Sequence, residues 1–155
     1  MSRRQVAWYG VLWTARIATA VGLVIDAYIH LHLAPLYAEG GGAINEGVLF
    51  RAEAAAALLV AAAIIAVGRR VCYLAGLLVA ASALATMLVS RYIDLGQIGP
   101  FPDLYDPAWY PEKLLAAYAE GAAAAAALAG VILTRPAGKS QPRAALRQRL
   151  TGNRN

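Results

Sequence analysis

The stretch D-A-Y-I-H-L-H-L-A-P, residues 26–35, closes the first long apolar segment of the chain and holds both of its histidines. Asp26 and His30 are four residues apart, so a helix would place them on one face. Polar groups in the hydrocarbon of a bilayer are costly unless they have partners. We therefore expect a membrane helix that ends in a polar cluster, with neighbouring helices supplying the partners.

The composition agrees with a membrane protein. Hydrophobic residues make up 60% of the 155 residues, and the mean hydropathy is +0.53, whereas soluble domains contain about 45–50% apolar residues. Four segments, at residues 6–33, 48–68, 71–93 and 112–134, approach or exceed the roughly 20 residues that a spanning helix needs. The sequence therefore predicts an all-α bundle of four transmembrane helices within residues 1–134. A disordered basic tail is expected at residues 135–155.

The first segment could also be read as a signal peptide, because basic residues precede it. Trp8, Trp13, Arg16 and Asp26 interrupt it, however, and its purely apolar core is short. A secretory signal has an uninterrupted apolar core and a small-residue cleavage site. We therefore interpret the segment as a long membrane helix. Arg16 is expected to snorkel past Trp13 or to pair with a polar group of a neighbouring helix.

Charge gives an expected orientation. Ten of the fourteen Lys and Arg residues lie at the start of the chain, in the turn at residues 69–70, or in the tail. The positive-inside rule makes that side cytoplasmic, so we expect a multi-pass protein of the cell (plasma) membrane with both termini in the cytoplasm. The tail is expected to contact anionic lipids of the bilayer rather than nucleic acid. The acids all fall on the opposite side or on outward halves of helices: Asp26, Glu39, Glu46, Glu53, Asp94, Asp103, Asp106, Glu112 and Glu120.

Two interpretations of this segregation remain open. In the first, acids simply avoid the inner face, although acids contribute little to topology. The alternative is an outward-facing polar site built from carboxylates, imidazoles and cations. Its candidate residues are Asp26, His30, His32, Arg51, Glu53, Arg91, Asp94, Glu112, Lys113 and Glu120.

Within this set, Asp26, His30 and His32 are the candidate metal ligands. A carboxylate with imidazoles suits zinc, copper or a non-haem iron. Residues two apart on a continuous helix point about 200° from each other, so the set requires the helix to unwind by His32. The alternative is that both histidines only hydrogen-bond acids at the membrane interface.

The second segment carries Arg51 and Glu53, which face different ways on a helix. Each is expected to reach another helix, Arg51 towards Asp26 or Asp94 and Glu53 towards a histidine or Lys113. The alternative is that both are solvated interfacial charges. In the fourth segment Lys113 and Glu120, seven apart, share a face, and Glu120 lies deep enough to need a partner.

The connection at residues 94–111 has an unusual composition. It contains four prolines and four aromatic residues. Proline restricts the backbone, and amphipathic aromatic rings favour the membrane interface. We expect this connection to be an ordered outer loop that lies over the mouth of the bundle as a lid.

Four stretches, I-H-L-H-L-A (29–34), L-F-R-A-E-A (49–54), R-Y-I-D-L-G-Q-I-G-P (91–100) and Y-D-P-A-W-Y-P-E-K (105–113), resemble a family of uncharacterised four-helix integral membrane proteins of actinobacteria. The likeness covers about residues 22–134 and implies a fold and a membrane location. A looser similarity, in architecture and in polar residues at outer helix ends, is to DoxX-like membrane proteins. Some of those serve quinone-linked oxidoreductases, so this likeness implies a quinone as a candidate cofactor.

Several activities find no support in the chain. It lacks G-x-S-x-G, P-loop, G-x-G-x-x-G and H-E-x-x-H motifs, and its single cysteine, Cys72, excludes an internal disulfide and a C-x-x-C pair. Three function classes remain. The first is a binding or accessory subunit, as a homo-oligomer or within a larger membrane complex. The others are a redox protein using a transition metal or quinone, and a small proton- or cation-coupled transporter.

Overall fold

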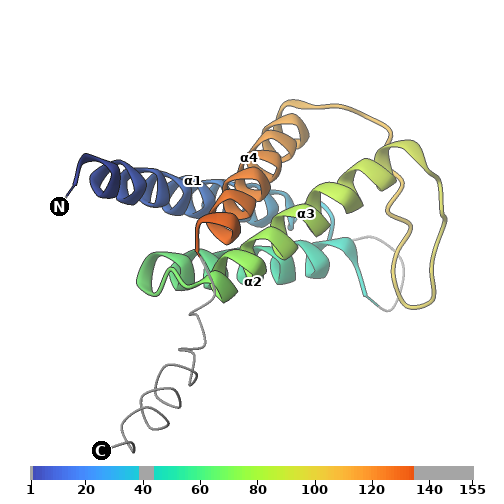
Figure 1. Cartoon of the computed structure of the whole chain (residues 1–155). Helices are drawn as coiled ribbons and strands as arrows, with labels where there is room; N and C mark the ends of the chain where they lie inside the picture. Colours follow the sequence, from blue (N-terminus) through green and yellow to red (C-terminus); the bar gives the residue numbers. More distant parts are fainter. Residues whose placement is uncertain (1, 39–43, 135–155) are drawn as a thin grey trace, which may run out of the picture.

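The computed structural model describes residues 2–38 and 44–134 and shows four long helices (Figure 1). These are α1 (Arg3–Leu33), α2 (Glu46–Ala66), α3 (Arg70–Tyr92) and α4 (Pro111–Leu133). Each is long and apolar enough to cross a membrane, so the predicted all-α class with four spanning helices is confirmed. The tail predicted at residues 135–155 lies outside the described residues.

Local sequence sets the helix starts. Ser2 and Gln5 form a reciprocal capping box at the start of α1, which satisfies amide groups that lack partners within the helix. The Asn45 side chain accepts a hydrogen bond from the Val48 amide at 2.9 Å at the start of α2. Pro111 occupies the first turn of α4, where its missing N–H costs nothing.

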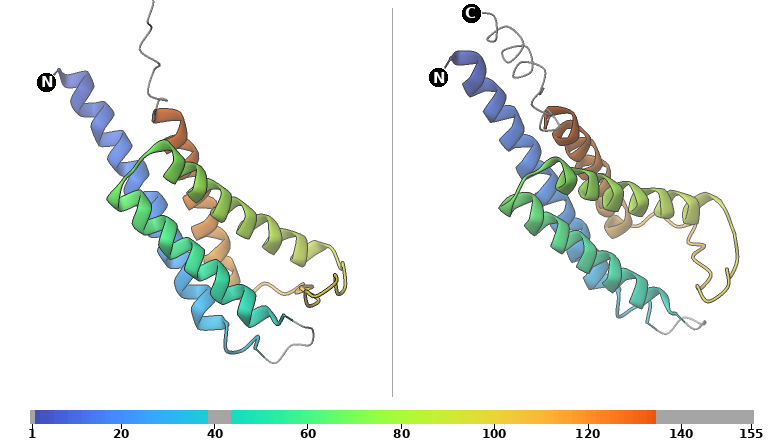
Figure 2. Two further views of the ribbon diagram at one scale, coloured as in Figure 1. Left: turned by 90° about the horizontal axis from the view of Figure 1, so that it is seen from below. Right: turned by 60° about the horizontal axis from the view of Figure 1, so that its bottom comes forward.

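The bundle is built around α1, which packs against α2 on one side and α4 on the other, while α3 packs mainly on α4. We call the end with residues 34–38 and 93–110 the loop end, and the opposite end, with the start of α1 and the α2–α3 turn, the terminal end. Two views show α2 and α3 close together at the terminal end and diverging towards the loop end (Figure 2).

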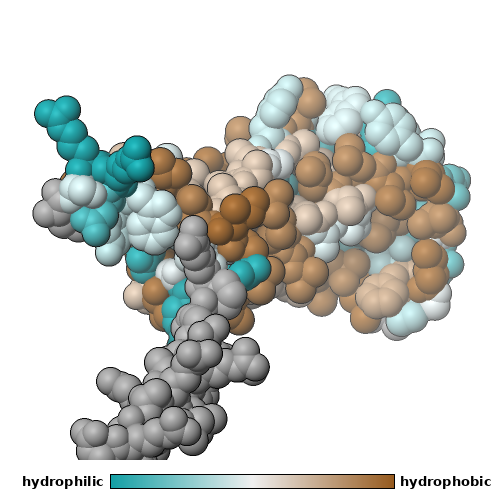
Figure 3. All heavy atoms as spheres, in the orientation of Figure 1, coloured by the Kyte–Doolittle hydropathy of each residue, from teal (hydrophilic) through white to brown (hydrophobic). Residues whose placement is uncertain are grey.

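Small residues fill the interior and large apolar ones cover the outside. Ala54, Ala57, Ala80 and Ala123 are fully buried. Exposed large residues include Leu59 at 73%, Leu78 at 70% and Ile132 at 69%, and apolar atoms dominate the visible face of the helical region (Figure 3). Helices in lipid associate through close backbone packing rather than through burial of large apolar side chains. This inverted distribution therefore supports a multi-pass membrane protein.

α1 and α4 cross closely at Gly22. A Cβ atom at this position would lie 2.8 Å from the Ala123 Cβ atom and 2.9 Å from the Ala119 carbonyl oxygen. Glycine is therefore required here by the close approach of the two backbones. This contact fixes the part of α1 that carries Asp26 beside the middle of α4.

Arg16 joins α1 to the end of α2. Its Nε atom donates to the Ile64 carbonyl oxygen at 2.7 Å, and its Nη2 atom donates to that of Ile65 at 2.5 Å. These carbonyls belong to the last turn of α2, where the helix offers no partner and a cation is favourable. The expected pairing of Arg16 with a neighbouring helix is therefore observed, and the guanidinium also lies over the Trp13 ring, 4.7 Å from its centroid. Gly68 has φ +60° and packs directly on the guanidinium.

Candidate functional site

A buried polar cluster joins α1 to α4. Asp26 is 0% exposed and Glu120 is 1% exposed. The Nδ1 atom of His30 lies 2.8 Å from Oδ1 of Asp26 and 3.1 Å from the Asp26 carbonyl oxygen. One ligand atom from each of Asp26, His30 and Glu120 lies within 4.8 Å of the others. The structure thus brings three of the predicted site residues together in the interior of the bundle.

The carboxylates of this cluster are poorly satisfied. The ring nitrogen of His30 forms its hydrogen bond with the Asp26 backbone carbonyl and has only a close ion-pair contact with Oδ1. Neither carboxylate oxygen of Asp26 or Glu120 accepts a hydrogen bond from any residue that the structure describes. A buried polar atom without a partner costs about 1–3 kcal/mol, and more when it is charged. A cation, a proton or a hydrogen-bond donor at this position would therefore compensate the buried carboxylates.

A cavity of about 440 Å³ adjoins the cluster in the loop-end half of the bundle. All four helices contribute to its wall, which includes His30, Glu53 and Glu120 at one part of its surface. Most of the remaining wall is apolar, with Leu49, Phe50 and Met87 among the larger side chains. His30 and Phe50 meet edge to face, with ring centroids 5.1 Å apart. The cavity therefore combines an apolar chamber with a carboxylate- and imidazole-bearing wall.

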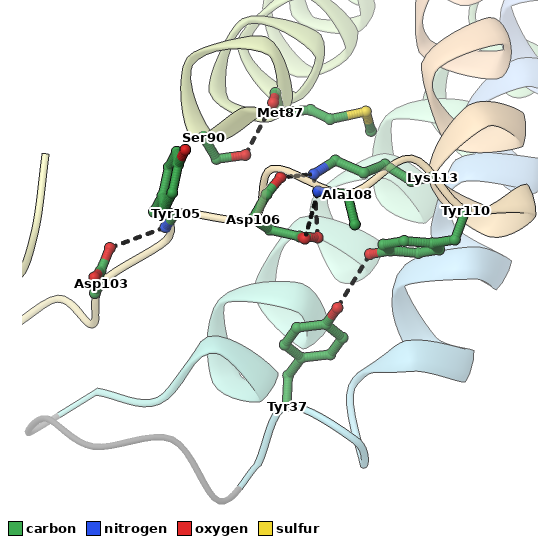
Figure 4. A network of polar contacts seen from close by, with 9 residues as sticks. All are labelled: Tyr37, Met87, Ser90, Asp103, Tyr105, Asp106, Ala108, Tyr110 and Lys113. Carbon is green, nitrogen blue, oxygen red and sulfur yellow. Dashed lines mark hydrogen bonds and ion pairs between the residues drawn. The ribbon is translucent and has the colours of Figure 1, made fainter. Parts of the chain in front are cut away.

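Residues 104–110 complete the wall of the cavity at the loop end (Figure 4). The Asp106 amide donates to the Ser90 carbonyl oxygen on α3 at 3.0 Å. The Lys113 Nζ atom lies 2.6 Å from the Asp106 carbonyl oxygen and 3.1 Å from its Oδ2 atom. These contacts tie the segment to both α3 and α4.

Tyr37 and Tyr110 add a second link across the loop end. Their hydroxyl groups are 3.1 Å apart, and both side chains line the cavity. Burial and the hydrogen bond to Tyr37 raise the pKa of Tyr110 above its usual range. The phenol therefore stays neutral, and able to donate a hydrogen bond, throughout the physiological pH range.

The other predicted site residues lie apart from the cluster. His32 is exposed and stacks on Tyr28, with ring centroids 6.1 Å apart. The unwinding that a ligand set including His32 requires is not seen, because α1 continues to Leu33. Arg91 lies against the rings of Tyr92 and Trp109, at 5.0 and 5.9 Å from their centroids. The remaining three side chains are exposed: Arg51, Asp94 and Glu112.

Sequence reasoning did not single out several residues that form the cavity. Nothing in the sequence set Tyr37 or Phe50 apart, Tyr110 was one of four aromatic residues in its connection, and Asp106 was one acid among nine. The available signal was the spacing of Asp106 and Lys113 across Pro111. Because Lys113 begins the inward face of α4, an acid just before the helix can reach its ammonium group.

Fold and site together are of the multi-pass membrane protein type, with four helices long and apolar enough to span a bilayer and a polar cluster beside a cavity between them. Comparison with protein-family models, with curated proteins and with solved structures gives no match to this chain. The function is therefore argued from the cavity and from the residues that line it.

Proposed function

We propose that this chain is a membrane-embedded binding protein that holds a small amphipathic molecule in the cavity. The observation that carries the proposal is a chamber of about 440 Å³ whose wall is largely apolar by area and also carries polar side chains from all four helices. Ligand sites are commonly concave, mostly apolar and about 300–1,000 Å³ in volume, with polar groups that orient the ligand. The volume and the apolar area of the cavity fall within this description.

The wall indicates how such a molecule would lie. Its apolar body would contact Leu49, Phe50 and Met87, and its polar end would face His30 and Glu53. The Oε1 atom of Glu53 is buried and has no hydrogen-bond partner among the described residues. A ligand hydroxyl or amine directed at this oxygen would supply the missing donor.

A quinone-linked redox role is the second candidate. A quinol carries ring hydroxyls on an apolar body. Its hydroxyls could donate to carboxylate oxygens of the wall such as those of Glu53, and its ring could contact the rings of Phe50 and Tyr37. The third class, a proton- or cation-coupled transporter, is less well supported, because the described lining residues lie in the loop-end half of the bundle. Transport would need a second opening at the terminal end.

The proposed orientation has the loop end outside the cell and the terminal end in the cytoplasm of the plasma membrane. Arg3, Arg4, Arg69 and Arg70 begin α1 and α3 at the terminal end, and basic residues near helix ends are retained in the cytoplasm. The cavity would then face the outer leaflet, with residues 104–110 lying over it as a lid.

The test uses the substitution Ala83→Phe, which places a phenyl group in the wall of the cavity. Wild-type protein is purified in mild detergent, and bound small molecules are extracted and measured by mass spectrometry. We expect a stoichiometric amphipathic compound in the wild type and a loss of at least tenfold in Ala83→Phe, since the added ring occupies part of its volume.

Ala81→Phe is the matched control, because Ala81 lies on the same helix but is exposed and outside the cavity wall. It should retain the compound at the wild-type level. An equal loss in both variants, or extracts of the wild type that contain only bulk lipid in bulk proportions, would refute the binding function.

A further inference from the structure

We infer that Asp26, His30 and Glu120 form a binding site for a divalent first-row transition-metal ion. The site is distinct from the predicted ligand set, because it replaces His32 with a residue of α4. It also does not rest on the proposed binding of an organic molecule, since the three ligands are side chains of α1 and α4 alone.

The separations fit one ion. Zinc binds imidazole nitrogen and carboxylate oxygen at about 2.0–2.2 Å in a tetrahedral arrangement, so any two of its ligand atoms lie about 3.4 Å apart. The Nδ1 atom of His30 and Oδ1 of Asp26 are 2.8 Å apart, and the whole set lies within 4.8 Å. A bound tetrahedral ion would draw the widest pair together by up to about 1.4 Å, to the ligand spacing of zinc.

The ligands come from rigid elements. Asp26 and His30 are one turn apart on α1, and Glu120 lies near the middle of α4. The close α1–α4 crossing at Gly22 lies one turn from Asp26 and fixes the two helices against each other. Sites built on packed helices hold their geometry better than sites on loops.

The second observation is the set of unsatisfied oxygens. Both Asp26 oxygens and both Glu120 oxygens are buried without a hydrogen-bond partner among the described residues. The cation nearest along α4, Lys113, has its ammonium group bound to Asp106 instead. Carboxylates deep in a membrane protein require compensation, and a divalent ion compensates two of them at once.

The donor set also selects the metal. Imidazole favours zinc, iron, copper and nickel, whereas magnesium and calcium prefer oxygen ligands alone. Three protein ligands leave at least one coordination position open in a tetrahedral ion. His30 and Glu120 both line the cavity, so the open position would face the chamber, where a ligand head group or water would complete the coordination.

Zinc binding to the purified full-length protein tests this inference. The protein, with any affinity tag removed, is stripped with a chelator in mild detergent, and zinc is titrated against a chromophoric competitor. About one zinc ion per chain is expected, because the site offers one complete ligand set. Glu120→Gln, Asp26→Asn and His30→Gln should each weaken binding by at least about 100-fold, more than loss of an outer partner alone.

His32→Gln and Glu112→Gln are the matched controls, because each removes a similar group that is exposed and outside the cluster. Both should bind zinc as the wild type does. If the wild type binds no stoichiometric zinc, or if the control variants lose it to the same degree as Glu120→Gln, the inference is overturned. A metal-free wild type whose thermal stability rises on Glu120→Gln would show that the carboxylates share a proton instead.

Two further measurements separate folding and pocket effects from metal binding. Zinc should raise the melting temperature of the wild type and leave that of Glu120→Gln unchanged, a result that does not depend on comparing their absolute stabilities. Ala83→Phe should keep its zinc while losing the organic compound. Zinc binding by a wild type that carries no organic compound would therefore refute only the proposed function. A bound organic compound in a wild type that binds no zinc would refute only the metal site.

Discussion

The contact between Lys113 and Asp106 predicts how firmly residues 104–110 are held over the cavity. Lys113→Met removes the ammonium group and keeps most of the apolar side chain. The substitution leaves both the Asp106 carboxylate and its backbone carbonyl without the donor that they have in the wild type. We expect the segment to open more often while the helices remain packed.

The magnitude follows from burial. The Lys113 side chain is 5% exposed, whereas that of Asp106 is 27% exposed. Removing one partner of a fully buried ion pair costs about 3–5 kcal/mol, but water reaches the Asp106 carboxylate and reduces that cost. A hydrogen bond to a charged group contributes about 1.5–3 kcal/mol, so we expect local opening to become easier by about 2 kcal/mol.

Hydrogen exchange measured by mass spectrometry reports this opening directly. The Asp106 amide donates to the Ser90 carbonyl oxygen, so peptides that contain it are protected only while the segment is closed. Since 1.4 kcal/mol corresponds to a factor of ten, Lys113→Met should accelerate their exchange about 30-fold. Peptides from α1 and α2 should be unchanged.

Two further variants separate the effect of the ion pair from other contacts of this segment. Asp106→Asn keeps the backbone contact to Lys113 and loses only the charge, so its effect should be smaller, about fivefold for 1 kcal/mol. Asp103→Asn changes an acid of the same connection whose side chain accepts only from the nearby Tyr105 amide, and it should have little effect. Equal exchange in wild type and Lys113→Met would refute the view that this ion pair holds the segment.

Two further predictions concern the helix crossing and the tyrosine pair. Gly22→Ala should lower the free energy of unfolding by about 1–3 kcal/mol through overpacking against Ala123 and Ala119, seen as a lower melting temperature in detergent. Gly10→Ala, on the same helix with open space around it, should show no such loss. The pKa of Tyr110 is raised in the folded state. The neutral phenol therefore contributes its full share of folding stability at pH values below the pKa of tyrosine in the unfolded chain, about 10, and that contribution falls as the pH rises above this value. Thermal stability should therefore drop more steeply from pH 9 to 11 in the wild type than in Tyr110→Phe, and parallel profiles would contradict the assignment.

The helices followed from the sequence because apolar length is a local property. Each spanning segment needs about 20 apolar residues, and the described helices begin and end within three residues of the expected bounds. The position of Asp26 and His30 on one face follows equally from helix periodicity. Both inferences depend on residues close together in the chain.

The partners across helices could not be derived in this way. Which face of α4 meets α1 depends on the fit of Gly22 against Ala123, and a sequence contains no direct record of that rotation. Glu120 was expected to need a partner, but Asp26 and His30 could not be identified as its neighbours. For Arg51 the expected contacts with Asp26 or Asp94 are absent, because its side chain is exposed.

The contact of Arg16 with the end of α2 has a mechanical consequence. It fixes the α2–α3 turn to α1, and Gly68 packs on the same guanidinium. With the terminal end held in this way, a tilt of α3 about the turn would change the width of the cavity at the loop end. A helix of 23 residues is about 35 Å long, so a tilt of about 5° moves its far end by about 3 Å. A small change of angle at the terminal end is therefore amplified into a displacement of about one atomic diameter at the loop end.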